Sequence, residues 1–230
     1  MTVVKAYDIR GLVPDELTAP MLHRVGATFA TLVSSDRPRP AALVLGRDAR
    51  TSSPELARAF AAGATEAGLD VVDIGLASTD LLYYASGAWD LPGAMITASH
   101  NPGRYNGVKL CRAGAVPVGR DTGLGTIAAV LAGQEPSPAA ASSSGVVRER
   151  DVLGEYVGFL GGLVPLTGIR PLRVVVDAGN GMAGLTVPAV LGPTPVSVDG
   201  LYLELDGTFP HHPANPLDPQ TLVELQHRVR

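Results

Sequence analysis

The sequence has very little cysteine: Cys111 is the only one in 230 residues. A single thiol cannot form an internal disulfide, so a disulfide-stabilised secreted scaffold is excluded. No apolar run approaches the roughly 20 residues of a membrane span, and the first residues lack the apolar centre of a signal peptide. These absences predict a cytoplasmic protein with no membrane partner, in which Cys111 is a small buried core residue.

Charge is also scarce. Charged residues make up 17% of the sequence, and the formal net charge is −4. Lysines and arginines form no cluster or arm, so nucleic acid is not an expected partner. Apolar residues make up 46%, which is typical of a globular chain and excludes a disordered or fibrous one. A chain of this length can hold one large domain or two ordinary ones.

Short aliphatic segments alternate with amphipathic ones in the first half of the chain. Residues 41–45, 70–74 and 93–97 have the length and composition of strands buried on both faces. A further strand is predicted over 108–111, directly after a turn on Asn106–Gly107. Because strands alternate with helices, we predict an α/β fold with a mixed, mostly parallel sheet sandwiched by helices.

Two amphipathic helices are predicted among these strands. The apolar face of the first is formed by Leu22, Val25, Phe29 and Val33. The second begins after Ser52, which has capping-box spacing with Glu55, and Pro54 suits its first turn. Its predicted buried residues are Leu56, Phe60 and Ala64.

A stretch rich in Pro, Ala and Ser at 134–145 is a predicted linker. It separates a first domain, 1–133, from a second and similar domain, 146–230. Helices are predicted in the second domain at 151–160, 181–191 and 220–229, and strands at 172–176 and 196–198. Because no strand follows the last helix, we expect this domain to be incomplete and the remaining domains of a longer parent chain to be its partners.

The segment 97–110 carries the most distinctive chemistry. A predicted strand runs into Thr-Ala-Ser-His-Asn-Pro, which places Ser99 at a strand's carboxyl end, where open α/β sheets bind ligands. His100 is its neighbour, and Lys109 follows ten residues after Ser99. A hydroxyl beside an imidazole and an ammonium is a candidate nucleophile. The segment lacks the Gly-x-Ser-x-Gly elbow of hydrolases.

These residues resemble the α-D-phosphohexomutase superfamily, the phosphomannomutases and phosphoglucomutases. Its Thr-Ala-Ser-His-Asn-Pro loop and Tyr-Asn-Gly-x-Lys-Leu strand are matched at 97–102 and 105–110. Other motifs match in the same order along the chain: Tyr7–Gly11, Gly46–Arg50, Val175–Asp177 with Asn180–Gly181, and Phe209–Pro216, the last with one residue more than the family pattern. The resemblance covers nearly the whole chain and is nearest to phosphomannomutases.

The resemblance implies that phosphorylated Ser99 exchanges its phosphoryl group with a hexose phosphate through a hexose 1,6-bisphosphate, which also primes the enzyme. It implies that Arg10 holds phosphate or sugar oxygens and that Lys109 neutralises charge or assists proton transfer. It also implies that Tyr7 lines the sugar cleft and that His100 and Asn101 shape the loop. Such transfers depend on positioning and charge neutralisation.

The resemblance further implies Mg²⁺, bound by the Ser99 phosphate and by an Asp-Gly-Asp-x-Asp-Arg loop that this sequence does not contain. We therefore expect the chain alone to be inactive. For Arg47 and Arg50 the sequence favours anchoring of their turn through Asp48. The adjacent histidines His211 and His212 favour loop packing over metal binding, because no spaced second pair accompanies them.

Two other functions stay open. Gly179, Gly181 and Gly184 form a Gly-x-Gly-x-x-Gly after a predicted strand, and Asp199 follows at the spacing of a dinucleotide-binding fingerprint. An NAD-binding oxidoreductase domain is therefore one alternative. A non-catalytic phosphosugar-binding fragment is the other.

Overall fold

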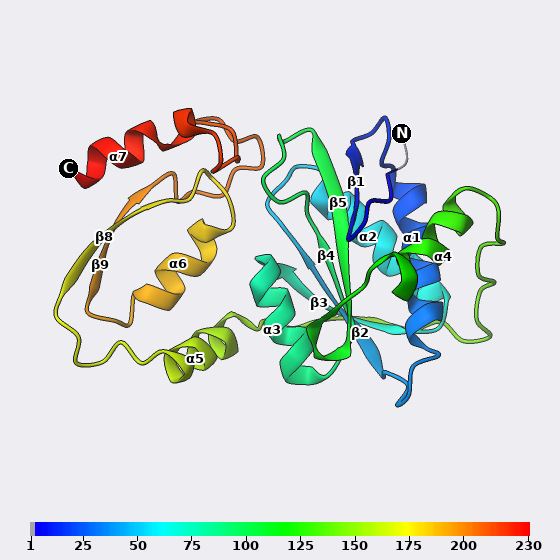
Figure 1. Ribbon diagram of the computed structural model, residues 1–230. Helices are drawn as coiled ribbons and strands as arrows, with labels where there is room; N and C mark the ends of the chain where they lie inside the picture. Colours follow the sequence, from blue (N-terminus) through cyan, green and yellow to red (C-terminus); the bar gives the residue numbers. More distant parts are fainter. Residues whose placement is uncertain (1–2) are drawn as a thin grey trace.

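The computed structural model describes residues 3–230, and Figure 1 shows two units of unequal size joined through α5. The first unit holds β1 to β7 and α1 to α4, and we call residues 153–230 the second unit. The strands of the first unit are β1 (Ile9–Leu12), β2 (Ala42–Arg47), β3 (Asp70–Leu76), β4 (Gly93–Ile96), β5 (Tyr105–Arg112), β6 (Val116–Pro117) and β7 (Val147–Glu149). Its helices are α1 (Ala19–Val33), α2 (Ser53–Glu66), α3 (Thr79–Trp89) and α4 (Leu124–Leu131).

Within residues 3–230 the seven strands of the first unit form one sheet, in the order β1-β5-β4-β2-β3-β7, with β6 paired to β5. The pairs β2–β3, β2–β4 and β3–β7 are parallel, whereas β5 is antiparallel to both β1 and β4. The prediction of a mixed, mostly parallel α/β sheet is confirmed. Because β4 is parallel to β2, their carboxyl ends lie at the same edge of the sheet, where Ser99 follows β4.

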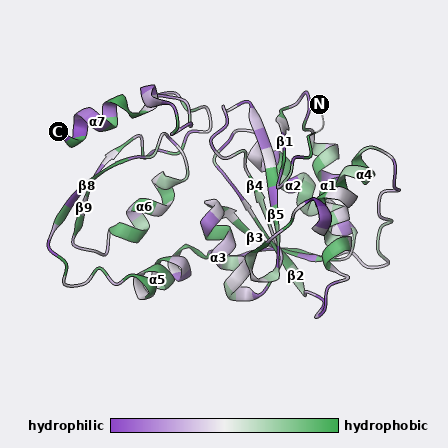
Figure 2. Cartoon of the chain, viewed as in Figure 1, coloured by the Kyte–Doolittle hydropathy of each residue, from purple (hydrophilic) through white to green (hydrophobic). Residues whose placement is uncertain are grey.

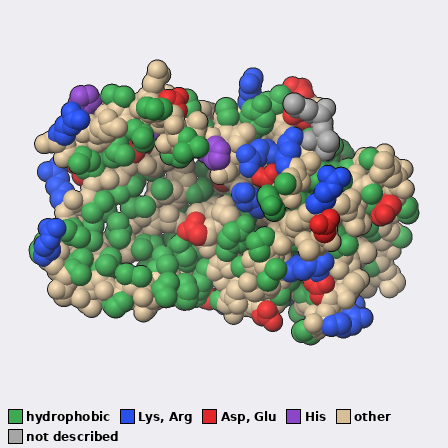
Figure 3. All heavy atoms as spheres, viewed as in Figure 1, with side chains coloured by type: hydrophobic (Ala, Val, Ile, Leu, Met, Phe, Trp, Pro, Cys, Tyr) green, Lys and Arg blue, Asp and Glu red, His purple; other side chains and the backbone are tan. Residues whose placement is uncertain are grey.

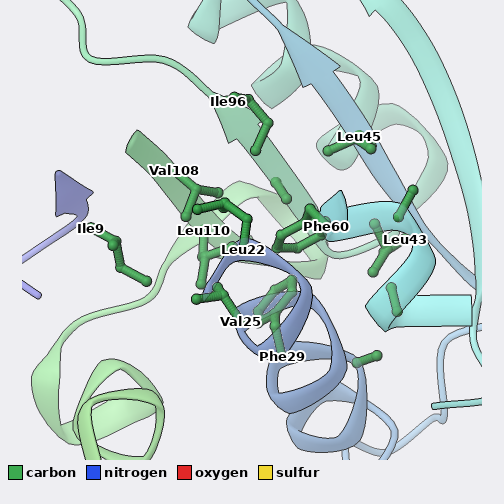
Figure 4. Packing of buried hydrophobic residues seen from close by; sticks show 14 of the residues in the cluster. Ile9, Leu22, Val25, Phe29, Leu43, Leu45, Phe60, Ile96, Val108 and Leu110 are labelled. Atoms are coloured by element: carbon green, nitrogen blue, oxygen red, sulfur yellow. The ribbon is translucent and has the colours of Figure 1, made fainter. Parts of the chain in front are cut away.

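Helices cover both faces of this sheet. Successive residues of a strand point to opposite faces, so one strand contacts helices on both sides. Leu43 and Leu45 of β2 face α1 and α2, whereas Val44 between them faces α3. Figure 4 shows the core on the first face, with both predicted helix faces inside it. Its labelled residues are Ile9, Leu22, Val25, Phe29, Leu43, Leu45, Phe60, Ile96, Val108 and Leu110. Cys111 is buried, as predicted.

Two local predictions are wrong. The backbone of Ser52 is already helical and its hydroxyl accepts a hydrogen bond from Asn106 Nδ2 at 2.8 Å, so the capping box with Glu55 does not form. Asn106 and Gly107 lie inside β5, since the strand begins at Tyr105. A tertiary contact decides both cases: β5 passes close to the start of α2 and pairs with β1 and β4.

The predicted linker runs along the surface of the first unit. The backbone amides of Ala141 and Gly145 donate to the last turn of α2, at Glu66 and Thr65. The chain then forms β7, which pairs with β3 although it lies inside the predicted second domain. Backbone pairing, which the sequence of Val147–Glu149 does not reveal, places this segment on the first sheet.

The second unit has little buried interior. It contains α5 (Leu153–Leu163), β8 (Leu172–Asp177), α6 (Ala183–Leu191), β9 (Val196–Leu201), a short 3-10 turn (Pro219–Leu222) and α7 (Val223–Val229). β8 and β9 form a two-stranded parallel sheet, and every residue of α6 is at least partly exposed. Figure 2 shows that α5 and α6 are nevertheless mainly hydrophobic. Among residues 3–230, no helix has the length and apolar composition that crossing a membrane requires.

Candidate active site

Ser99 lies on an exposed loop just beyond the carboxyl end of β4. We call residues 97–105 the Ser99 loop. The φ angle of Ser99 is +56°, in the left-handed region that non-glycine residues adopt only when their surroundings hold them there. Its amide donates to Thr97 Oγ1 at 3.0 Å, and its Oγ lies 3.4 Å from His100 Nδ1. The hydroxyl is thus presented to solvent beside an imidazole.

Arg50, at the end of the turn after β2, lies under this loop. Its guanidinium donates to the carbonyl oxygens of Ser99 and Asn101 at 2.8 Å each, and to those of Pro102 and Tyr105 at 2.8 and 3.1 Å. Its Nε donates to Asp48 Oδ2 at 3.0 Å. The predicted Arg50–Asp48 pair is therefore present, but most of the arginine's hydrogen bonds go to the Ser99 loop.

A cavity of about 540 Å³ opens beside Ser99, between the two units. Its lining from the first unit includes Asp48, Ser78, Ser99 and His100. The second unit contributes Asp177 at the end of β8, most of the segment that follows it up to Met182, and the loop around Phe209 and His212. A volume of this size suits a small organic ligand.

A chain of charged residues approaches the Ser99 loop from β1 and β5. Arg10 Nη1 donates to Asn101 Oδ1 at 2.6 Å, and Arg10 Nη2 pairs with Asp8 Oδ2. The same Asp8 oxygen lies 3.7 Å from Lys109 Nζ. The structure thus brings together Arg10, Asn101 and Lys109 of the predicted site, with Asp8 between the two cations.

The predicted residues do not all reach the cavity. Ser99 and His100 line it, whereas Arg10 and Lys109 lie at the side of the loop that faces Asp8. Tyr7 is 77% exposed and lines a separate depression with residues 119–122. In Figure 3 several Lys and Arg side chains gather on the surface of the first unit, to the right of its boundary with the second unit.

On the opposite side of the cavity, His212 pairs with Asp177 at 3.1 Å. Burial is the largest influence on His212 and opposes its charge, but hydrogen bonds to the Pro213 carbonyl and to Asp177 together raise the pKa of His212 above its ordinary value. His211 stacks on Tyr202, with ring centroids 3.9 Å apart. These contacts fit the predicted loop-packing role of the two histidines.

Comparison with known proteins decides the family. Residues 1–136 match the description "Phosphoglucomutase/phosphomannomutase, alpha/beta/alpha domain I", and residues 155–230 match "alpha/beta/alpha domain II" of the same family. The chain belongs to the phosphoglucomutase/phosphomannomutase family. The resemblance drawn from the motifs is therefore confirmed.

Individual relatives agree with this assignment. A phosphomannomutase of Escherichia coli is 37% identical over 237 residues, covering 100% of this chain and 51% of the relative. Proteins named phosphohexose mutases from Xanthomonas campestris include one that is 39% identical over 217 residues, covering 94% of this chain and 47% of the relative. A solved phosphoglucomutase/phosphomannomutase family protein from Burkholderia thailandensis has a TM-score of 0.86 at 32% identity, over 100% of this chain and 50% of that one. The chain thus spans about half the length of the curated relatives it matches.

The family assignment also accounts for the glycine motif at 179–184, which lies within domain II. Gly184 packs against the chain after β9, where an added Cβ would lie 1.9 Å from the Leu203 carbonyl oxygen. Gly179 has a φ of +50° and donates its amide to Asp177 Oδ1 at 2.9 Å. Turn geometry explains Gly179, and close packing explains Gly184.

The described residues do not form a Mg²⁺ site by themselves. Among residues 3–230, no group of three or more His, Cys, Asp and Glu side chains is arranged to hold a metal ion. Asp48 and Asp177 line the cavity, but their carboxylates already accept hydrogen bonds from Arg50 and from the Gly179 amide. Mg²⁺ prefers several oxygen ligands in octahedral array, which these two engaged carboxylates do not supply.

Sequence reasoning did not assign site roles to Asp8, Asn106 or Phe209, and it limited Arg50 to its turn. For Asp8 a signal was present: it lies two residues before Arg10, so an extended backbone points both side chains to one side. For Arg50 the partners on the loop are 49 to 55 residues away and are backbone carbonyls. Backbone acceptors leave no residue-type signal in a sequence.

Proposed function

We propose that this chain is the phosphoserine-bearing part of a phosphosugar mutase of the phosphomannomutase/phosphoglucomutase type, with Ser99 as the phosphoryl carrier. One observation carries the proposal. In a chain of this family, an exposed serine hydroxyl faces a cavity of about 540 Å³ from a loop whose backbone is held in a left-handed conformation. A site that transfers a phosphoryl group needs such a fixed, accessible oxygen.

The proposed reaction has two balanced transfers. In the first, the bond between phosphorus and Ser99 Oγ breaks while phosphorus bonds to the free hydroxyl oxygen of a hexose 1- or 6-phosphate. The proton of that hydroxyl passes to Ser99 Oγ, with Lys109 or His100 as the group that assists. The hexose 1,6-bisphosphate then turns around. The bond between its other phosphorus and the sugar oxygen breaks while that phosphorus bonds to Ser99 Oγ, and the serine proton passes to the sugar oxygen, which leaves the isomeric hexose phosphate.

The charges near the Ser99 loop support these roles. A serine phosphate carries a charge of about −1.5 to −2 near neutral pH and is stabilised by cationic neighbours. Arg10 reaches the loop through Asn101, and Lys109 lies on the adjacent strand, both oriented by Asp8. We include Tyr7 as a sugar-binding residue in the proposal, although its side chain lies in a separate depression in this structure.

Mg²⁺ belongs to the proposal for the whole protein, in which its carboxylate ligands come from outside this chain. Hexose 1,6-bisphosphate is the proposed primer, hexose phosphates are the substrates, and the compartment is the cytoplasm. We propose that the 230-residue chain alone turns over no substrate, because its own residues leave the metal and the far end of the sugar unheld. Lost proximity of this kind can cost about 7–11 kcal/mol.

Intact-mass analysis tests the carrier role. After incubation with glucose 1,6-bisphosphate and Mg²⁺, the full-length protein is expected to gain one phosphoryl group, and its Ser99→Ala variant is expected to gain none. Ser78→Ala is the matched control, because Ser78 lines the same cavity. A phosphoryl group retained by Ser99→Ala would contradict the assignment. In the full-length protein, assayed with mannose 1-phosphate and glucose 1-phosphate, Ser99→Ala is expected to abolish turnover.

A further inference from the structure

The contacts of Arg50 have a role beyond fixing its own turn. An arginine has five N–H donors in a planar fork, and here all five are used. One goes to Asp48, and the other four go to carbonyl oxygens spread over seven residues of the Ser99 loop. The side chain is almost completely buried, at 1% exposure. A buried cation with every donor engaged holds its acceptors firmly, since breaking any bond leaves a buried polar group unsatisfied.

A second set of hydrogen bonds fixes Asp48, the carboxylate that pairs with the guanidinium. Asp48 Oδ1 accepts from the Arg50 amide at 3.1 Å and from Ser53 Oγ at 2.6 Å. Ser53 Oγ in turn accepts from Asn106 Nδ2 at 2.9 Å. Burial lowers the pKa of Arg50, although the adjacent Asp48 carboxylate opposes the shift. Ser53 of α2 and Asn106 of β5 thus hold Asp48, and Asp48 in turn orients the guanidinium of Arg50.

A loop of the second unit packs against Arg50 and against the turn that carries it. The guanidinium carbon of Arg50 lies 5.0 Å from the centroid of the Phe209 ring, a cation–π contact. Next to Phe209, the backbone at Gly207 comes so close that an added Cβ would lie 2.2 Å from the Ala49 carbonyl oxygen. A Cβ added at Gly103, on the Ser99 loop, would lie 2.9 Å from the Gly207 carbonyl oxygen. One loop of the second unit thus contacts both the Arg50 turn and the Ser99 loop.

We propose that Arg50 is a positioning residue that holds the Ser99 loop in the conformation used for phosphoryl transfer, and that Phe209 of the second unit completes this support. The inference rests on the proposed carrier role of Ser99. Arg50 donates to the carbonyl of Ser99 itself and lies beneath the loop, so it acts on the orientation of Oγ. A lysine cannot replace it, because one ammonium with three donors cannot reach four carbonyls and a carboxylate in a plane.

Hydrogen exchange measured by NMR on the 230-residue chain tests the loop-holding part directly. The reporters are the amides of Ser99, Asn101 and Tyr105, which bond within the loop to Thr97 Oγ1, Ala98 O and Pro102 O. Arg50→Lys is expected to speed their exchange at least about tenfold, the effect of losing one hydrogen bond to a charged group. Phe209→Leu is expected to act in the same direction with a smaller effect. Arg47→Lys, at the last residue of β2 and three residues before Arg50, is the matched control and is expected to change nothing.

Kinetics of the full-length protein test the positioning role. Arg50→Lys is expected to lower kcat by about 100-fold, the scale for small misplacement of a reacting group, with KM for the hexose phosphate changed less than about threefold. A purely structural arginine would instead lower the melting temperature and speed exchange throughout β2 and β4. That pattern would overturn the proposal, and so would unchanged loop exchange or unchanged kcat in Arg50→Lys. If Ser99 never accepts a phosphoryl group while loop exchange still responds, the carrier role is wrong and the structural support stands.

Discussion

Asp8 orients two cations with one carboxylate. Its Oδ2 pairs with Arg10 and lies 3.7 Å from Lys109. The two cations nevertheless depend on it to different degrees. Arg10 is bonded to Asp8 and Asn101, whereas the Lys109 contact is long and its side chain is 26% exposed. At 3.7 Å the Lys109 contact is beyond hydrogen-bond distance, so this pair is expected to contribute less to stability than the Arg10 pair, and to leave the charge of Lys109 free to act on a phosphate.

Lys109→Ala is therefore expected to separate activity from stability. In the full-length protein it should lower turnover by about 100-fold or more, the scale for loss of a positioned charge or acid–base group. Its melting temperature should barely change. Arg112→Ala is the matched control on the same strand. Arg112 is the last residue of β5 and pairs with Asp36, which lies after α1. Normal turnover of Lys109→Ala, or its unfolding, would contradict the role.

At the scale of elements, the loop at 206–216 is held against the carboxyl end of β8. His212 reaches Asp177, the last residue of that strand, and Asp177 also accepts from the Gly179 amide. Because the partners of His212 raise its folded-state pKa above its unfolded value, protonation stabilises this contact. The contribution is fully present below the unfolded pKa, about 6.5, and is lost as pH rises through the folded pKa.

His212→Asn is thus expected to destabilise the chain more at pH 5.5 than at pH 8.5. The difference should reach up to about 1 kcal/mol, the scale of a single ion pair near the surface. Denaturant unfolding at the two pH values measures it, and His227→Asn on exposed α7 controls for the loss of a histidine. If the difference in unfolding free energy between wild type and variant instead grew as pH rose, the expected direction of the effect would be wrong.

At the scale of the molecule, the two units differ in how much apolar surface they bury. The first has cores on both faces of its sheet. The second exposes a broad hydrophobic face, shown in green in Figure 3. Its exposed large apolar residues include Phe159, Leu163, Val164, Leu217, Val223 and Val229. A two-stranded sheet with so little covered surface is marginally stable.

The two units are connected at a second contact, between α5 and α3. Tyr156 of α5 is buried against α3, and its hydroxyl donates to Asp80. Burial is the main cause that raises the pKa of Tyr156, with Asp80 adding to it. Its ring lies 5.6 Å from that of Tyr84. This contact anchors α5, so the part of the second unit beyond α5 is the part expected to open.

Hydrogen exchange of the whole chain is expected to show that the second unit is less stable than the first. Amides of β8, β9 and α6 should exchange at least about tenfold faster than those of β2, β4 and α1, because opening a thinly packed unit requires less free energy than opening a full core. Limited proteolysis should cleave residues 165–230 first. Uniform protection across both units would mean that the contacts around Phe209 and Tyr156 join them into one cooperative structure.

Much of the fold and the centre of the site were predictable from local signals. The strands at 41–45, 70–74 and 93–97 were found because each is a short aliphatic run, and α1 and α2 because their apolar residues recur at helical spacing. The family was found because its motifs are local and ordered. β7 was missed because nothing in Val-Arg-Glu distinguishes an edge strand. The predicted capping box is absent because the Ser52 hydroxyl accepts a hydrogen bond from Asn106 instead.

By itself, the sequence of this protein determined the α/β class, the family and the position of Ser99 after a strand, since each depends on residues close together in the chain. Only the tertiary structure decided what holds that serine. Arg50, Asn106 and Phe209 come from three separate segments and act largely through backbone carbonyls or ring faces. Such contacts depend on the distance between segments after folding, and residue type alone does not encode that distance.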